Sequence, residues 1–399
     1  MPFKAKKHLP RVVDARHSPA RTQADMILTN CAACAAPLDH DAPRCVRCKT
    51  RYCNSTCQHD HWRRGHKQIC KKIHRGGNAE QYHADKEYKA VVAVAVEACA
   101  EDTKGQTCYI CTEALHWKTK ESIVRGCACR GTAGFAHVSC LAEQATILRK
   151  EAEENNLDDK ACNERWARWE VCSLCEQNYH DVVFCALGWA CWKTYVDRPE
   201  TKGVRRSAMT HLGNGLSAVG NYADALFVQE AELSLEQRIG TSEEFMLIMQ
   251  NNIANTYQNL GRLDKTLLTR RDVCFGYMRI KGEKHRASLM VANNYAASLK
   301  DQNRFDEVKS LLRKRIPMAR RVLGETDIAT LTMRWQYAEA EYRDVRATLG
   351  DLREAATTLE ETERTARRVL GNSHPTTRGM ECHLQNARAA LSTREGTPP

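Results

Sequence analysis

The metal-binding character of this chain is set by residues 31–70, which read CAACAAPLDHDAPRCVRCKTRYCNSTCQHDHWRRGHKQIC. Cysteine and histidine recur here at the spacings C-x2-C, C-x2-C, C-x3-C and H-x3-C. Donors at such intervals are typical of closed, tetrahedral zinc sites. A segment this short buries too little apolar surface to fold alone, so the metal is expected to supply most of its folding energy. The eight predicted ligands, enough for two zinc ions, are Cys31, Cys34, Cys45, Cys48, Cys53, Cys57, His66 and Cys70.

The order of these ligands resembles the MYND zinc finger. The resemblance is carried by residues 52–58 (YCNSTCQ), by Trp62 and by residues 66–70 (HKQIC). It covers the whole finger and implies two interleaved sites. The first implied site is Cys31, Cys34, Cys53 and Cys57, and the second is Cys45, Cys48, His66 and Cys70.

A second group of eight metal donors lies between residues 108 and 175. Their spacing again predicts two zinc ions, four in the whole chain, but it leaves open whether the pairs combine sequentially or crosswise. The predicted ligands are Cys108, Cys111, Cys127, Cys129, His137, Cys140, Cys172 and Cys175.

This second group resembles the RING-CH finger of MARCH-type ubiquitin ligases, through residues 127–132 (CACRGT), 136–141 (AHVSCL) and 169–175 (WEVCSLC). The resemblance implies a crossed pairing: Cys108, Cys111, His137 and Cys140 for one ion, and Cys127, Cys129, Cys172 and Cys175 for the other. It also implies that Ile110 contacts a ubiquitin-conjugating enzyme. Two positions depart from the family pattern: Gln144 replaces a usual tryptophan, and Glu176 stands where a basic residue is common.

The C-terminal half repeats with a period of 42 residues: Gly240, Gly282 and Gly324 are evenly spaced, and a 47-residue interval leads to Gly371. Residues 252–260 and 265–279 are predicted as the two helices of one hairpin, and the glycines suit the position after a helix where φ is positive. One hairpin cannot bury its apolar face alone, so the hairpins are expected to stack.

Residues 220–226 (GNYADAL) and 369–376 (VLGNSHPT) make the array resemble the long tetratricopeptide repeats of kinesin light chains, over residues 207–392. The resemblance implies a groove for peptides or proteins. Five asparagines on the first helices either bind the backbone of a ligand or tie neighbouring repeats together. They are Asn214, Asn251, Asn255, Asn293 and Asn294.

The predicted fold class is mainly α, with two small zinc-stapled modules followed by an α-solenoid of tetratricopeptide-like hairpins. Sixteen of the 20 cysteines lie between Cys31 and Cys175, which separates the two halves. The predicted parts are a disordered basic arm (1–29), a MYND-type finger (30–72), a helical linker (73–106), a RING-CH-like finger with a long internal helix (107–180), a capping helix (181–206), the repeats (207–392) and a tail (393–399).

Composition narrows the partners and the compartment. The longest uncharged apolar run, residues 182–192, is shorter than the roughly 20 residues of a membrane span, so no membrane insertion is expected. Without an apolar stretch near the N-terminus, reduced thiols in the cytoplasm or nucleus are expected. The basic arm is best explained as a solvated tail, with a nuclear signal or transit peptide as the alternative. Cations beside the zinc sites offset the thiolates, so nucleic acid is not an expected partner.

Two functions fit these modules. The first is a zinc-binding adaptor that holds partner peptides or proteins through its MYND finger and repeats. The second is a RING-CH-type ubiquitin-protein ligase, which would position the thioester of a conjugating enzyme and needs no catalytic residue of its own. The chain has no phosphate loop, paired-carboxylate site or hydrolase motif, so the sequence assigns it no catalytic residues.

Overall fold

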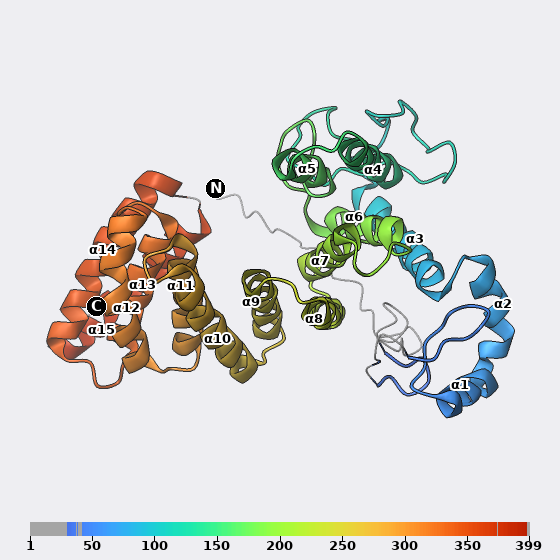
Figure 1. Cartoon of the computed structure of the whole chain (residues 1–399). Helices are drawn as coiled ribbons and strands as arrows, with labels where there is room; N and C mark the ends of the chain where they lie inside the picture. The colour runs from blue at the N-terminus through green and yellow to red at the C-terminus, as the bar shows by residue number, and fades with distance from the viewer. Residues whose placement is uncertain (1–29, 37, 39–41, 373, 397–399) are drawn as a thin grey trace. The chain divides into compact units, whose positions relative to one another are not determined.

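The computed structural model describes residues 30–36, 38, 42–372 and 374–396 (Figure 1). The arm predicted at residues 1–29 and the end of the predicted tail, residues 397–399, lie outside this part of the chain. The chain forms two compact units, Met1–Val228 and Gln229–Pro399. Their boundary falls within helix α8 (Tyr222–Ile239).

The first unit begins with a finger made of two turns and short helices. Asn54 starts its first helix by accepting a hydrogen bond from the backbone N–H of Cys57. The chain kinks at Gly65, whose φ of 134° is a backbone conformation that other residues rarely adopt. Asn78 caps the long helix that leaves the finger. The helices are α1 (Ser55–His61), a π-helical stretch (Trp62–His66), α2 (Lys67–Arg75) and α3 (Ala79–Cys99).

A second small module follows α3, and its turns are joined by isolated β-bridges rather than by strands. The long internal helix predicted for this module is present and starts at Val138. Val183 of α6 (Asp181–Tyr195) packs closely on Gly126. A Cβ atom added to Gly126 would lie 2.4 Å from the Cβ of Val183. The helices are α4 (Val138–Glu154), α5 (Asp159–Trp166), a 3-10 turn (Ala167–Trp169), α6 (Asp181–Tyr195) and α7 (Gly203–Ala218).

Helix α6 is the centre of the first unit. It is apolar on nearly every face, which is typical of a helix surrounded by protein. It packs on α3, α4 and α7. Two glycines let α6 and α7 approach closely: a Cβ on Gly188 would lie 3.2 Å from the carbonyl oxygen of His211, and one on Gly215 would lie 3.1 Å from the Cα of Cys185.

The second unit is a succession of helical hairpins, in which each helix packs on the next. In addition, α11 packs on α13 and α13 on α15, so the first helices of successive hairpins stack. The four repeat glycines have positive φ, between 71° and 96°, as the sequence predicted. The helices are α9 (Glu243–Asn259), α10 (Leu263–Lys281), α11 (Arg286–Asp301), α12 (Phe305–Val322), α13 (Ile328–Arg343), α14 (Leu349–Leu370) and α15 (Pro375–Glu395).

Three side-chain hydrogen bonds, which we call the rungs, join residues 43 positions apart on the first helices of neighbouring hairpins. Because the period is 42 residues, each rung leans by one residue toward the next hairpin. The rungs run from Asn294 to Asn251 (3.4 Å), from Gln258 to Asp301 (2.9 Å) and from Gln336 to Asn293 (3.2 Å).

The predicted fold class is confirmed: the chain is mainly helical, with two cysteine-rich modules followed by a solenoid of hairpins. The helices are longer than the periodicity indicated. α9 begins at Glu243 because Ser242 caps it, and α10 begins at Leu263, inside the predicted turn. Among the described residues, no helix is both long and apolar enough to cross a membrane.

Candidate metal centres and interaction surfaces

The structure gathers the sixteen predicted ligands into four groups of four. In each group the ligand atoms all lie within 4.8 Å of one another. The groups correspond to the interleaved and crossed pairings that the two resemblances implied and that spacing alone left open. They are Cys31, Cys34, Cys53 and Cys57; Cys45, Cys48, His66 and Cys70; Cys108, Cys111, His137 and Cys140; and Cys127, Cys129, Cys172 and Cys175.

Four pairs of cysteines, eight ligands in all, sit on turns of the same kind. In each C-x2-C turn, the residue after the second cysteine donates its backbone N–H to the carbonyl of the first, and its φ is positive. These residues are Ala35, Lys49, Thr112 and Glu176, with φ between 55° and 65°. The turn directs both sulfurs to one side. Glu176, a departure from the RING-CH pattern, therefore stands in an ordinary turn.

Helical segments supply four of the remaining eight donors, Cys57, His66, Cys70 and Cys140. Cys57 lies in α1, and Cys70 lies in α2 just after the kink at Gly65. This kink turns His66 and Cys70 toward the second turn, where the Nε2 atom of His66 lies 3.3 Å from the sulfur of Cys48. Sequence reasoning identified these donors but not the glycine that aims them.

A second glycine was also missed by the sequence analysis. Gly134 has a φ of 82°, and a Cβ there would lie 2.6 Å from the Cβ of Cys129, 2.9 Å from its sulfur and 3.1 Å from the sulfur of Cys127. The backbone thus passes directly against the fourth group. The only signal in the sequence was a glycine close to two cysteines, which is too common to interpret.

The distances fit zinc. For Zn–S bonds of about 2.3 Å, tetrahedral geometry places two sulfurs about 3.8 Å apart, and a sulfur and a nitrogen slightly closer. The sulfurs of Cys45 and Cys70, and those of Cys129 and Cys172, are 3.8 Å apart. These separations also exclude disulfide bonds, whose sulfurs lie about 2.05 Å apart.

His137 is oriented by a backbone contact. Its Nε2 atom lies 3.3 Å from the carbonyl oxygen of Ala114, which can only accept a hydrogen bond. Nε2 therefore carries the proton, and the lone pair of Nδ1 points to the sulfurs of Cys111 and Cys140, at 3.4 and 3.5 Å. This arrangement suits a metal ligand, whose second nitrogen usually donates to a carbonyl or carboxylate.

The electrostatics of the thiols also favour a cation. Burial opposes ionisation of Cys31, but backbone N–H groups that point at its sulfur outweigh it and lower the pKa to about 6. Burial and the neighbouring sulfurs of Cys34 and Cys31 raise the pKa of Cys53 to about 12. One thiolate thus opposes the next, and a bound divalent cation removes that repulsion. Burial, aided by His61, lowers the pKa of His66 to about 4, so its ring is neutral near pH 7.

Ile110 lies on the first turn of the second module with 37% of its surface exposed. Leu174, on the turn between Cys172 and Cys175, is 51% exposed. The hydroxyl groups of Tyr109 and Ser173 lie 3.1 Å apart and hold the two turns side by side. Ile110 and Leu174 are therefore exposed apolar residues on adjoining turns, of which the sequence analysis identified only the first.

The predicted asparagines make mostly internal contacts. Asn251, Asn293 and Asn294 take part in the rungs, and Asn255 accepts a hydrogen bond from the buried guanidinium of Arg270, at 2.9 Å. The rungs join neighbouring hairpins, whereas the bond of Asn255 lies within one hairpin. Asn214 is half-buried in α7, which lies in the first unit.

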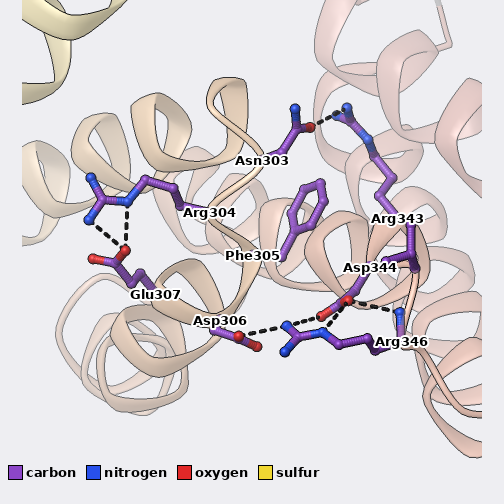
Figure 2. A pocket seen from close by; sticks show the side chains of 9 residues that line it. Asn303, Arg304, Phe305, Asp306, Glu307, Arg343, Asp344 and Arg346 are labelled. Atoms are coloured by element: carbon purple, nitrogen blue, oxygen red, sulfur yellow. Dashed lines mark hydrogen bonds and ion pairs between the residues drawn. The ribbon is translucent and has the colours of Figure 1, made fainter.

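A hollow of about 450 Å³ lies where α12 begins and α13 ends (Figure 2). Phe305 lies beneath the guanidinium of Arg343, 5.4 Å from ring to group. Arg346 pairs with Asp306 (2.6 Å) and with Asp344 (3.2 Å). Lys309, at 2.8 Å, and Arg346 together hold the pKa of Asp344 well below its usual range. These internal pairs leave little net charge to attract a charged ligand.

Comparisons with known proteins found similarities to the first finger and to the helical repeats. Residues 31–70 match the MYND finger family. The MYND finger implies bound zinc, in agreement with the first two groups of donors. Its match covers 40 residues of the chain, so it identifies this module alone.

Two plant enzymes share a short segment with the chain. Ubiquitin carboxyl-terminal hydrolase 17 of Arabidopsis thaliana is 45% identical over 53 residues, which is 13% of this chain and 7% of that protein. Ubiquitin C-terminal hydrolase 15 of Oryza sativa subsp. japonica is 51% identical over 43 residues, 10% of this chain and 4% of that protein. The chain thus spans less than a tenth of either relative.

Among solved structures, nearly identical TPR-like repeats from a Podosopora anserina protein assigned to the kinesin light chains align with 58% of this chain and 97% of that one. The sequence identity is 16% and the TM-score is 0.41.

Proposed function

We propose that this chain is a zinc-binding interaction adaptor, which holds partner peptides or proteins through its MYND finger and its helical repeats. One observation carries the proposal: each of the four groups already offers four protein donors. A zinc ion so surrounded has no open position for substrate or water and serves to build a surface rather than to catalyse. The four ions and the sixteen ligands are part of this proposal.

Two cysteine variants of the full chain test the adaptor function. Cys48→Ser removes a buried donor of the MYND finger, and Cys382→Ser changes an exposed cysteine that belongs to no donor group. Each variant is cross-linked in cells, its partners are identified, and binding is repeated with the purified partner. We expect Cys48→Ser to lose partners that Cys382→Ser retains. Identical partners for both variants would show that the finger does not recruit them.

A second function, a ubiquitin-protein ligase, is favoured by one surface, the exposed pair Ile110 and Leu174 on adjoining turns. A conjugating enzyme would bury these side chains while its thioester is positioned for attack. The purified chain is assayed for ubiquitin chains with a panel of conjugating enzymes. A ligase should lose activity on Ile110→Ala and keep it on Val94→Ala, an exposed residue of α3. Silence across the panel would reject the ligase and leave the adaptor.

A further inference from the structure

We infer that the MYND finger carries a docking surface for an acidic protein segment that has an aliphatic side chain among its carboxylates. The inference rests on the proposed adaptor function and names the chemical class of the finger's partner. Its surface, which we call the basic rim, surrounds the second donor group of the finger. The basic rim comprises Arg47, Lys49, Lys67, Lys71 and Lys72 with the apolar residues Val46 and Ile69.

The donor group itself brings the basic rim together. Each rim residue is within two positions of Cys45, Cys48, His66 or Cys70, whose ligand atoms lie within 4.8 Å of one another. Adding the reach of the side chains and backbone, the rim spans less than about 20 Å. An extended segment of about six residues covers that distance, at about 3.3 Å per residue. One short peptide is therefore long enough to span the rim.

The charge of the basic rim exceeds what the zinc site requires. Three thiolates and a neutral histidine around a divalent zinc leave a net charge of about −1. The five cations would offset this several times over. Asp60 is the single acidic residue among the described residues between 30 and 78. None of the five cations forms an ion pair with a described residue, so their charge is available to a partner.

The aliphatic side chains favour a protein segment over nucleic acid. Val46 is 86% exposed and Ile69 is 44% exposed, and both lie next to a cysteine of the same donor group. A phosphate backbone gains nothing from contact with aliphatic side chains, whereas an acidic peptide can bury an aliphatic side chain against Val46 and Ile69. Carboxylates would supply the long-range attraction, and the apolar contact would fix the register.

The test uses the full chain, loaded with zinc, and a fluorescent peptide of about ten residues in which glutamates flank a central leucine. A matched peptide carries glutamine at every glutamate. Lys67→Glu with Lys71→Glu reverses two rim charges. Lys86→Glu with Lys89→Glu makes the same charge change on exposed residues of α3 and serves as the control. Zinc content, measured by native mass spectrometry, shows that each variant keeps its finger.

We expect the acidic peptide to bind, the glutamine peptide not to bind, and the rim variant to lose affinity by about tenfold, with the control changing by less than about twofold. Val46→Ser with Ile69→Ser should weaken binding of the peptide that contains leucine but not binding of a peptide made of glutamate alone. Equal losses for the rim and control variants, absence of peptide binding, or tighter rim-dependent binding of duplex DNA would overturn the inference.

This failure is distinguishable from failure of the adaptor function. If the rim variant captures the same cellular partners as the unmodified chain while Cys48→Ser loses them, the finger recruits proteins by another surface. If Cys48→Ser also loses nothing, the adaptor role of the finger itself is wrong.

Discussion

The substitution Gly134→Ala tests how closely the backbone approaches the sulfurs of the fourth donor group. The added methyl group would lie 2.6 Å from the Cβ of Cys129 and within 3.1 Å of two ligand sulfurs. Overpacking of this kind costs about 1–3 kcal/mol, and alanine at a φ of 82° adds about 1–2 kcal/mol. Gly131→Ala, in the same loop, has a similar φ of 61° but meets no atom within 4 Å, so it carries only the backbone cost.

The two variants should therefore differ by about 1–3 kcal/mol, or by about fivefold to 150-fold in the zinc affinity of the fourth donor group. Competition with a chelator, followed by native mass spectrometry, measures the loss of one ion at a time. We expect Gly134→Ala to lose one zinc ion well before the others, and Gly131→Ala to lose it later, shifted from the unmodified chain by the backbone cost alone. Equal zinc release from both variants would refute the close approach of the backbone to these sulfurs.

Three further outcomes are expected. Chelation of all zinc should expose the first unit to protease while the second unit keeps its helical circular dichroism; simultaneous loss of both would contradict two separate cores. Glu339→Ala should lower the free energy of unfolding of the second unit, measured with urea, by about 3–5 kcal/mol, because Glu339 is buried between Lys300 and Arg343, both at 2.8 Å. The control Glu360→Ala removes a more exposed ion pair and should cost less than about 1 kcal/mol. Burial, aided by nearby carboxylates, raises the pKa of Glu341 to about 7, so the folded unit should lose stability as pH rises from about 4.5 to 7. Glu341→Gln should restore up to about 3 kcal/mol near pH 8 and change little near pH 4, and a pH-independent effect would count against this burial.

Much of the architecture could be read from periodicity. The even spacing of Gly240, Gly282 and Gly324 predicted the hairpins because the end of a helix needs a positive φ, and that requirement is local. Spacing also singled out the sixteen residues that the structure gathers into four groups. For the eight cysteines of the C-x2-C pairs the reason is local, because a turn of two intervening residues has few ways to present two sulfurs. The pairing was different: Cys31 and Cys53 come together through the path of the whole finger, which no local rule contains.

Contacts between distant residues were the part that sequence reasoning missed. The capped start of α9 at Ser242 needed the preceding turn to be known. The closeness of Gly134 to Cys129, and of Gly126 to Val183, depends on tertiary approach of backbones. The asparagines could be assigned to neither role from the sequence, since their partners, such as Gln336 for Asn293, lie on another hairpin.

The rungs have a consequence for how an array of this kind can change its length. Asn251 and Asn293 hold the same place in consecutive hairpins, 42 residues apart. If a gene deletion removed residues 252–293 in one block, Asn251 would meet Gln336, the partner that Asn293 already uses. A duplication of the block would likewise recreate its own hydrogen bonds. The rung to Gln336 would thus survive the loss of a hairpin, whereas Asp301 would lose its partner Gln258 and Asn294 would become the chain neighbour of Asn251. The 47-residue interval before Gly371 breaks the even repeat at the C-terminal end.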